Sequence, residues 1–209
     1  MMYNDCEVKT MKYVIFSLIN YLIGSVPWAL VIGKVFYHTD VRQYGSGNPG
    51  ATNTGRVLGR RPAFIVAFLD GLKGTLAYLL EALINPSAAL FAALFTVIGH
   101  CWPLFASFKG GKGVATAFGV ILGVSLSDWK MLDICFIIPV IVWFLISHFT
   151  EYVSLASLFA LLVSACLSTL ACDNIYVTLV FTLIFALVAF RHHENIKRLI
   201  EGNESKKNY

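Results

Sequence analysis

The chain has 209 residues, of which 57% are hydrophobic and only 13% are charged, and its formal net charge is +4. A soluble domain of this length would carry about twice that charged fraction, so the composition excludes an ordinary soluble protein and indicates an integral membrane protein. The small net charge matters less than the places where the charges lie.

Seven apolar segments follow one another along the chain. They cover residues 13–36, 62–84, 87–107, 114–127, 132–149, 153–171 and 175–190. Most reach the length of about 17–25 residues that a helix needs to cross the hydrocarbon layer. The first is too long for a cleavable signal peptide and lacks a small-residue cleavage site. Segment 114–127 is short and is alternatively a re-entrant helix, so the number of crossings needs an independent argument.

The basic residues provide that argument. They gather between the first and second segments, between the third and fourth, and after the seventh, whereas the other connections are neutral or net acidic. Seven crossings place every basic connection on the cytoplasmic side, with the N-terminus outside. A re-entrant segment would move the basic tail to the outside. We therefore predict a single all-α domain over residues 1–209 with seven transmembrane helices, a cytoplasmic C-terminus and a short tail from about residue 191.

Five cysteines are scattered among these segments. They form no C-x-x-C pair and no disulfide-like spacing. We interpret them as small apolar side chains of membrane helices.

The first connection, residues 37–61, contains Gly-Ser-Gly-Asn-Pro-Gly-Ala-Thr-Asn from position 45. It matches G-x-G-x-x-G by letter but follows a membrane helix and not a strand, so a dinucleotide site is excluded by context. Turn chemistry alone is one interpretation. The other is a site for a hydroxylated, phosphorylated small molecule, because five hydrogen-bonding side chains lie within eleven residues: Ser46, Asn48, Thr52, Asn53 and Arg56.

A few polar residues lie inside or at the ends of apolar segments. Asp70 and Lys73 are three residues apart and therefore share a helix face. We favour a structural pair that neutralises itself and braces the first connection, although membrane charges are functional candidates by default. His100 is interpreted as a partner for a neighbouring helix. Ser154, at the start of the sixth segment, either faces a site or bonds its own helix backbone, and the sequence favours the second.

The glycine loop, residues 109–113, reads Lys-Gly-Gly-Lys-Gly and precedes the apolar run from Val114. Its glycines let several backbone N–H groups point at one place, and a helix is expected to start just after it. Amides, a helix N-terminus and ammonium groups favour a phosphate or another anion. The alternative is a plain cytoplasmic turn whose lysines obey the positive-inside rule. It is not a Walker A loop, because Lys112 is followed by glycine and position 106 is not glycine.

The tail begins Arg-His-His-Glu-Asn-Ile-Lys-Arg-Leu at position 191. If the last helix continues, His192 and Asn195 lie on one side, and Glu194 pairs with Arg198 at i,i+4. The His-His-Glu run does not indicate a metal site, because adjacent side chains point apart and H-x-x-x-H is absent.

Taken together, these blocks resemble the acyl-phosphate:glycerol-3-phosphate acyltransferases, the bacterial PlsY family. The likeness rests on G-S-G-N-P-G-A-T-N with Arg56, on F-K-G-G-K-G-V-A-T-A-F-G, on R-H-H-E-N-I-K-R-L and on the shorter Y-V-S-L-A-S, and it covers nearly the whole chain. It implies a seven-helix protein of the bacterial cytoplasmic membrane whose site faces the cytoplasm. The implied reaction moves an acyl group from acyl phosphate to the 1-hydroxyl of glycerol 3-phosphate. Its products are lysophosphatidic acid and phosphate, in the first acylation of phospholipid synthesis.

The resemblance also implies roles for individual residues. The implied catalytic group is Lys112, Ser154, His192 and Asn195, and the implied substrate-binding group is Ser46, Asn48, Asn53, Arg56, Gly110, Gly111, Gly113, Glu194 and Arg198. We expect no cofactor, no metal and no nucleic acid. The expected partners are both substrates and membrane lipids, and the soluble enzyme that makes acyl phosphate is a further candidate.

This sequence departs from the family pattern at two positions. Gly55 stands where a larger side chain is expected, which would loosen Arg56. Glu151 stands where a basic residue is frequent, which removes a positive charge near the cytoplasmic face.

Acyl phosphate is a mixed anhydride with a good leaving group, so no covalent enzyme intermediate is needed. The protein must hold two anions together, which explains basic residues and loop amides in one small volume. The proton acceptor stays open between a substrate phosphate oxygen and His192. Two other classes are weighed: a transporter for a phosphorylated metabolite, and a non-catalytic subunit that binds the acyl-phosphate-making enzyme.

Overall fold

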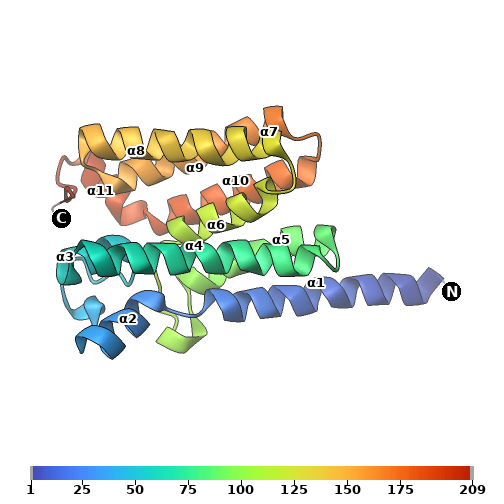
Figure 1. Cartoon of the computed structure of the whole chain (residues 1–209), viewed down its shortest axis with the longest axis horizontal. Coiled ribbons are helices and arrows are strands. Elements are labelled where there is room, and N and C mark those ends of the chain that lie inside the picture. The colour runs from blue at the N-terminus through green and yellow to red at the C-terminus, as the bar shows by residue number, and fades with distance from the viewer. Residues whose placement is uncertain (1, 208–209) are drawn as a thin grey trace.

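The computed structural model describes residues 2–207, with side chains from residue 10 onward, and over this range it contains helices and no strand. The α-helices are α1 Met2–Gly24, α2 Trp28–Tyr37, α3 Ala51–Leu58, α4 Arg60–Ala82, α5 Pro86–Cys101, α6 Val114–Ser125, α7 Trp129–Met131, α8 Ile138–Thr150, α9 Val153–Ala171, α10 Ile175–Arg191 and α11 His193–Ile200. The longer helices run roughly along one axis, as Figure 1 shows for α1, α4 and α8.

In the part of the chain that the structure describes, five helical spans are long and apolar enough to cross a membrane: Thr10–Tyr37, Arg60–Ala82, Pro86–Ala106, Trp129–Thr150 and Val153–Ala171. Helices α10 and α11, which are bent by 64° relative to each other, make a sixth only if the pair is counted as one broken span. The predicted all-α membrane architecture is therefore confirmed. Helix α6 has 12 residues, or about 18 Å of rise, against a hydrocarbon core of about 30 Å. Seven full crossings and the orientation of the termini therefore stay predictions.

The first span is not the continuous helix expected over residues 13–36. It breaks after Gly24 and resumes at Trp28. Pro27 lacks a backbone N–H and cannot continue the helical ladder. The Lys73 ammonium of α4 donates to the freed carbonyl oxygens of Gly24 (2.9 Å) and Val26 (3.0 Å). A buried cation thus satisfies backbone groups that have no water to bond with inside a membrane.

A second proline disturbs the span from Trp129 to Thr150. Residues Leu132–Ile137 form a π-helical turn just before Pro139. Pro139 has no N–H to donate to the carbonyl of Cys135, four residues earlier. The Ser164 hydroxyl of α9 donates to that carbonyl instead, at 2.7 Å. This bond ties α9, whose first turn carries Ser154, to the neighbouring span.

Helices α4 and α6 pack with their backbones almost touching. A Cβ added at Gly119 would lie 1.9 Å from the Gly71 carbonyl oxygen, and one at Gly74 would lie 2.3 Å from the Thr116 carbonyl oxygen. Small residues at facing positions are typical of helix pairs in membranes, where close van der Waals contact stabilises association. The close approach fixes the start of α6, and with it the glycine loop, against α4.

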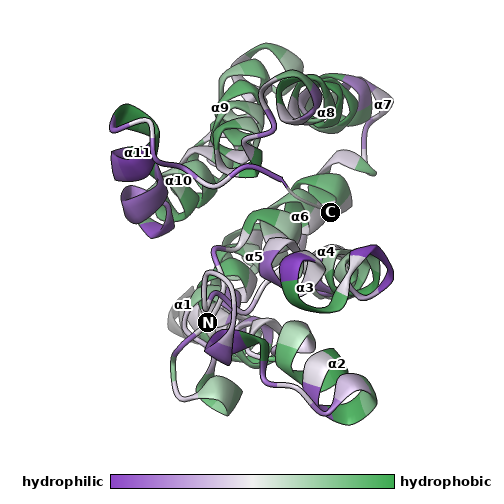
Figure 2. Ribbon diagram, turned by 90° about the vertical axis from the view of Figure 1, so that its left-hand side faces the viewer, coloured by the Kyte–Doolittle hydropathy of each residue, from purple (hydrophilic) through white to green (hydrophobic). Residues whose placement is uncertain are grey.

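The polar segments gather at one end of the bundle. In Figure 1, α2, α3, α11 and the C-terminus lie at the end opposite the N-terminus. Figure 2 views that end and shows its loops, α3 and most of α11 as hydrophilic against the apolar bundle behind. The prediction that the first connection and the tail share one surface is therefore confirmed.

Candidate active site

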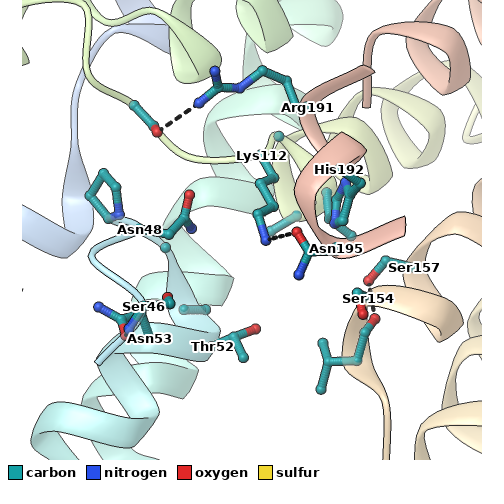
Figure 3. Close-up of a pocket in the computed structure, with 18 of the residues that line it drawn as sticks. Ser46, Asn48, Thr52, Asn53, Lys112, Ser154, Ser157, Arg191, His192 and Asn195 are labelled. Atoms are coloured by element: carbon teal, nitrogen blue, oxygen red, sulfur yellow. Dashed lines mark hydrogen bonds between the residues drawn. The ribbon is translucent and has the colours of Figure 1, made fainter. Parts of the chain in front are cut away.

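A cavity of about 1300 Å³ opens at this polar end. Its walls come from the first connection and α3, the glycine loop and the start of α6, the start of α9, the junction of α10 with α11, and residues 204 and 205. All the predicted site residues line it except Gly111. In Figure 3, Ser46 and Asn48 lie on one side, Ser154 and Ser157 lie on the other, and Lys112 lies between them.

The glycines of the loop are required by close packing and not by mobility. A Cβ at Gly110 would lie 2.2 Å from the His100 carbonyl oxygen, and one at Gly111 would lie 2.2 Å from His100 Nε2. The Gly111 N–H donates to the same His100 carbonyl at 3.2 Å. Gly113 has φ +85°, in the left-handed region that favours glycine, and ends the loop where α6 begins. The predicted helix start at Val114 is confirmed.

Arg191 clamps the loop from the opposite side. Its guanidinium donates to the Gly110 carbonyl (3.1 Å) and to the Gly111 carbonyl (3.1 and 3.2 Å), and it lies over the Trp102 ring with 5.2 Å to the centroid. Figure 3 shows the side chain reaching the loop from above. Sequence reasoning assigned Arg191 only to the basic tail. The R-H-H-E block marked Arg191 as part of a motif. The neighbouring sequence did not indicate that its partners are the carbonyls of the glycine loop.

Beneath the loop lies a buried charged cluster. The Lys73 ammonium is 2.8 Å from Asp70 Oδ1 and 3.0 Å from His100 Nδ1, and His100 Nδ1 is 3.3 Å from the same carboxylate oxygen. The predicted pairing of Asp70 with Lys73, and of His100 with a neighbouring helix, is confirmed. The expected brace of the first connection is wrong: the cluster supports the break after α1 and, through His100, the glycine loop.

Lys112 projects from the glycine loop into the cavity and donates to Asn195 Oδ1 (Figure 3). Loss of hydration lowers the pKa of Lys112 to about 8, against the attraction of the Glu204 carboxylate and together with repulsion from Arg198 and Arg56. The ammonium is therefore a cation in a basic neighbourhood, with a single amide oxygen as its hydrogen-bond acceptor among the described residues. Binding of an anion beside this ammonium would be strongly favoured by electrostatic attraction.

His192 lies directly after α10 with its side chain buried. Its Nδ1 lies 2.8 Å from the Val188 carbonyl oxygen, and because a carbonyl only accepts, we assign the proton to Nδ1. Nε2 is then the acceptor. Burial, followed by repulsion from the Lys112 ammonium, lowers the pKa of His192 to about 4. The imidazole is therefore neutral at neutral pH and a weak base.

The helix bends at His192 and does not continue straight into the tail. The pair predicted within α11 is replaced by another. Arg198 does not pair with Glu194: its Nε donates to Glu204 Oε2 at 2.8 Å, while Glu194 pairs with His193 at 3.2 Å. The i,i+4 prediction failed because a carboxylate six residues further along folds back onto Arg198.

Glu204 lines the cavity, and the sequence did not reveal this. Its Oε1 accepts from Ser154 Oγ (2.9 Å) and from Asn195 Nδ2 (2.6 Å). The preferred interpretation of Ser154 as bonded to its own helix is therefore wrong, and Ser157 makes such a bond instead, to the Val153 carbonyl at 2.7 Å. A lone glutamate in a polar tail carries no pattern that predicts burial.

The first connection is organised around Asn53, which is 1% exposed. Its Oδ1 accepts from the Ser46 N–H (2.8 Å), and its Nδ2 donates to the carbonyls of Val41 (2.8 Å) and Tyr44 (3.1 Å). Asn53 therefore shapes the loop that presents Ser46 and Asn48 to the cavity. Arg56 donates to the Ser205 carbonyl at 3.4 Å.

Among the side chains that the structure describes, from residue 10 to residue 207, no cluster of three or more His, Cys, Asp or Glu could hold a metal ion. The cations and amides that surround the cavity are donors suited to anions.

Fold and site together define an integral membrane protein with a cavity lined by cations, amides and hydroxyls at one end of its helical bundle. Residues 14–202 match the glycerol-3-phosphate acyltransferase family model. The chain therefore belongs to the glycerol-3-phosphate acyltransferase family, as its sequence blocks predicted.

Individual relatives agree with this assignment. The glycerol-3-phosphate acyltransferase of Staphylococcus carnosus is 40% identical over 207 residues, covering 94% of this chain and 98% of that protein. Glycerol-3-phosphate acyltransferase 2 of Bacillus cereus is 41% identical over 201 residues, covering 94% and 96%. Among solved structures, the glycerol 3-phosphate form of PlsY (YgiH), an integral membrane glycerol 3-phosphate acyltransferase, superposes with a TM-score of 0.85 at 38% identity, covering 94% and 96%. The lysophosphatidic acid form superposes with a TM-score of 0.82 at 37% identity, covering 93% and 94%.

Proposed function

We propose that this protein transfers an acyl group from acyl phosphate to the 1-hydroxyl of glycerol 3-phosphate, releasing lysophosphatidic acid and phosphate. The observation that carries the proposal is the convergence of Lys112, Arg56 and the glycine loop on one cavity with Ser154 and Asn195. Family membership and the two PlsY forms support the acceptor and the product.

The cavity wall also supports an acyl donor. Beside its polar groups it is lined by Phe118 of α6 and by Val140 and Trp143 of α8. An acyl chain would lie against these apolar side chains while its phosphate meets the cations. Acyl phosphate fits such a site better than a coenzyme A thioester, because the chain has no recognisable element for an adenosine moiety.

In the proposed reaction, the hydroxyl oxygen attacks the acyl carbonyl carbon, the bond from that carbon to the phosphate oxygen breaks, and phosphate leaves. Lys112 and the glycine loop stabilise charge on the leaving phosphate. The hydroxyl proton goes to a substrate phosphate oxygen, whose second pKa near 6 makes it a stronger base than His192 in this environment. His192 and Asn195 then position the reactants, and no covalent intermediate forms.

The test uses purified protein in detergent with glycerol 3-phosphate and either palmitoyl phosphate or palmitoyl-coenzyme A, in a phosphate-free buffer. We expect lysophosphatidic acid from the acyl phosphate and little from the thioester. Comparable rates with both donors would overturn the proposed donor. Absence of product with either donor, combined with uptake of glycerol 3-phosphate into proteoliposomes, would favour a transporter.

We further propose that the protein crosses the bacterial cytoplasmic membrane seven times, that the polar end faces the cytoplasm, and that the soluble enzyme making acyl phosphate delivers it there. The basic connections support this orientation. A single reporter cysteine at Asn203, in a background without exposed cysteines, should resist an impermeant thiol reagent in intact cells and react after permeabilisation. Reaction in intact cells would overturn the orientation.

A further inference from the structure

The chain after α11 forms a strap, residues 201–207, that folds back over the cavity. Its reversal follows from Gly202, which has φ +72°. The Gly202 N–H donates to the Leu199 carbonyl (3.2 Å) and the Asn203 N–H to the Arg198 carbonyl (2.8 Å). This is the Schellman arrangement, in which a left-handed glycine ends a helix and turns the chain back. The strap is therefore directed toward the cavity by the helix end itself.

The Glu204 carboxylate at the centre of the strap is held as a bound anion would be. Ser154, Asn195 and Arg198 each donate to it at 2.6–2.9 Å, and its side chain is 5% exposed. Burial opposes the charged form, but the bonds from Asn195, Arg198 and Ser154 outweigh it and lower the pKa of Glu204. The carboxylate therefore stays ionised and uses three donors that would suit a phosphate.

Several contacts of the rest of the strap lie at exposed positions. Lys206 pairs with Glu151 at 3.0 Å, but the two side chains are 54% and 52% exposed, and exposed ion pairs stabilise little. The Lys207 N–H donates to the Glu151 carbonyl at 2.9 Å, and Arg56 reaches Ser205 at 3.4 Å. Glu151, the acidic departure from the family pattern, is thus an anchor for the strap. The family match ends at residue 202, before Glu204.

We propose that the strap is a built-in competitor, in which Glu204 occupies a phosphate subsite made by Ser154, Asn195 and Arg198 and leaves when a phosphate-bearing substrate binds there. The proposal rests on the proposed function for the identity of that substrate. It predicts that the strap-closed state lowers the apparent affinity for substrate by the fraction of molecules in which the subsite is free. Release of the strap is then a step that precedes binding of the phosphate-bearing substrate at this subsite.

The first experiment needs no turnover. Hydrogen exchange of the purified full chain is measured in detergent with inorganic phosphate, with glycerol 3-phosphate, and with glycerol as the control lacking phosphate. We expect both phosphate compounds to slow exchange in the glycine loop and to speed it in the strap, with no change in glycerol. Protection of the loop without faster exchange in the strap would overturn the competitor and leave the proposed function standing. Absence of loop protection would overturn both.

The second experiment compares Glu204→Gln with Glu201→Gln, a matched loss of charge on the same strap at an exposed residue outside the cavity. For Glu204→Gln we expect the KM for glycerol 3-phosphate to fall about 3- to 10-fold with kcat unchanged, because the free fraction rises. Glu201→Gln should behave as the wild type. A chain ending after Gly202 should reproduce the Glu204→Gln effect, and Glu151→Gln should show a smaller fall.

Two results would overturn the competitor. A higher KM in Glu204→Gln and in the shortened chain would mean that the carboxylate helps to build the substrate site. A lower kcat at saturating substrate would mean that the carboxylate acts in the reaction itself.

Discussion

The glycine loop and the strap both bring charge to the same cavity, but the structure holds them in opposite ways. The loop lies between the backbone of α5, the guanidinium of Arg191 and the buried charged cluster that includes His100, with no room for a Cβ at Gly110 or Gly111. The strap rests on exposed contacts outside its single buried carboxylate. The buried loop therefore supplies preorganised hydrogen-bond donors, whereas the strap supplies a charge that can be exchanged for a ligand.

The largest expected effect is on stability, and it comes from a change in the buried charged cluster that supports the glycine loop. Lys73→Met leaves Asp70 buried without its ammonium partner and leaves two backbone carbonyls unsatisfied. Removal of one partner of a buried pair typically destabilises by about 3–5 kcal/mol. We expect a large drop in Tm of the detergent-solubilised protein, with partial recovery in the double variant Asp70→Asn with Lys73→Met. A wild-type Tm for Lys73→Met would show that the cluster does not support the loop.

The next effect is on catalysis. Lys112→Ala removes the ammonium that bonds Asn195 without changing a loop glycine. The transition state should lose about 2–4 kcal/mol of stabilisation, so kcat/KM should fall roughly 30- to 1000-fold. Lys112→Arg should recover little, because a planar guanidinium does not replace a compact ammonium in a cramped loop. Lys197→Ala, an exposed lysine of α11, is the matched control and should keep wild-type kinetics. Equal losses in both variants would indicate a general effect of net charge.

Two glycine substitutions test the contrast in packing directly. Gly110→Ala places a methyl group 2.2 Å from a backbone oxygen, and such overpacking costs about 1–3 kcal/mol and should displace the loop. Gly202→Ala meets open space and only strains φ, so it should loosen the strap while the bundle keeps its Tm. Measurements of both activity and Tm distinguish the effects of the two substitutions. If Gly202→Ala lowered the Tm as much as Gly110→Ala, the strap would be as tightly packed as the loop, and the contrast between them would be wrong.

A smaller effect concerns pH. Because the pKa of Lys112 is about 8, its charge is lost as pH rises through that value, and kcat/KM should decline above about pH 8. The free energy of unfolding moves the other way: between about 8 and the ordinary value of 10.5 the unfolded chain binds the extra proton, so this group favours the folded state more as pH rises. Lys112→Arg should lack the decline in kcat/KM despite its lower rate. A decline that persists in Lys112→Arg belongs to another group.

The smallest effect is expected at His192. If a substrate phosphate takes the proton, His192→Gln and His192→Asn should keep substantial activity. Their pH–rate profiles should follow the substrates without losing an enzyme limb near pH 4, the lowered pKa of His192. The profiles are compared at saturating and limiting glycerol 3-phosphate. Loss of kcat with substrate still bound, and its rescue by imidazole, would identify His192 as the general base.

The sequence by itself determined the features that depend on local pattern. Hydropathy located the apolar helices, the spacing of Asp70 and Lys73 placed them on one face, and the glycine loop before an apolar run predicted the start of α6. The sequence blocks identified the family and most residues that line the cavity. These predictions succeeded because helix periodicity, turn chemistry and short motifs are encoded within a few consecutive residues.

Only the tertiary structure decided which partners those residues have. Lys112 meets Asn195 across 83 positions, Arg191 meets Gly110 across 81, and Ser154 meets Glu204 across 50. The break after Gly24 was read as continuous helix because an apolar pattern does not record that Lys73 can satisfy the carbonyls freed before Pro27. Arg198 was assigned to Glu194 because sequence spacing favours the nearest carboxylate, whereas a left-handed glycine brings Glu204 back to it. Hydrogen-bond partners follow from proximity in space, and here proximity depends on how helices distant in the sequence pack and where the chain turns.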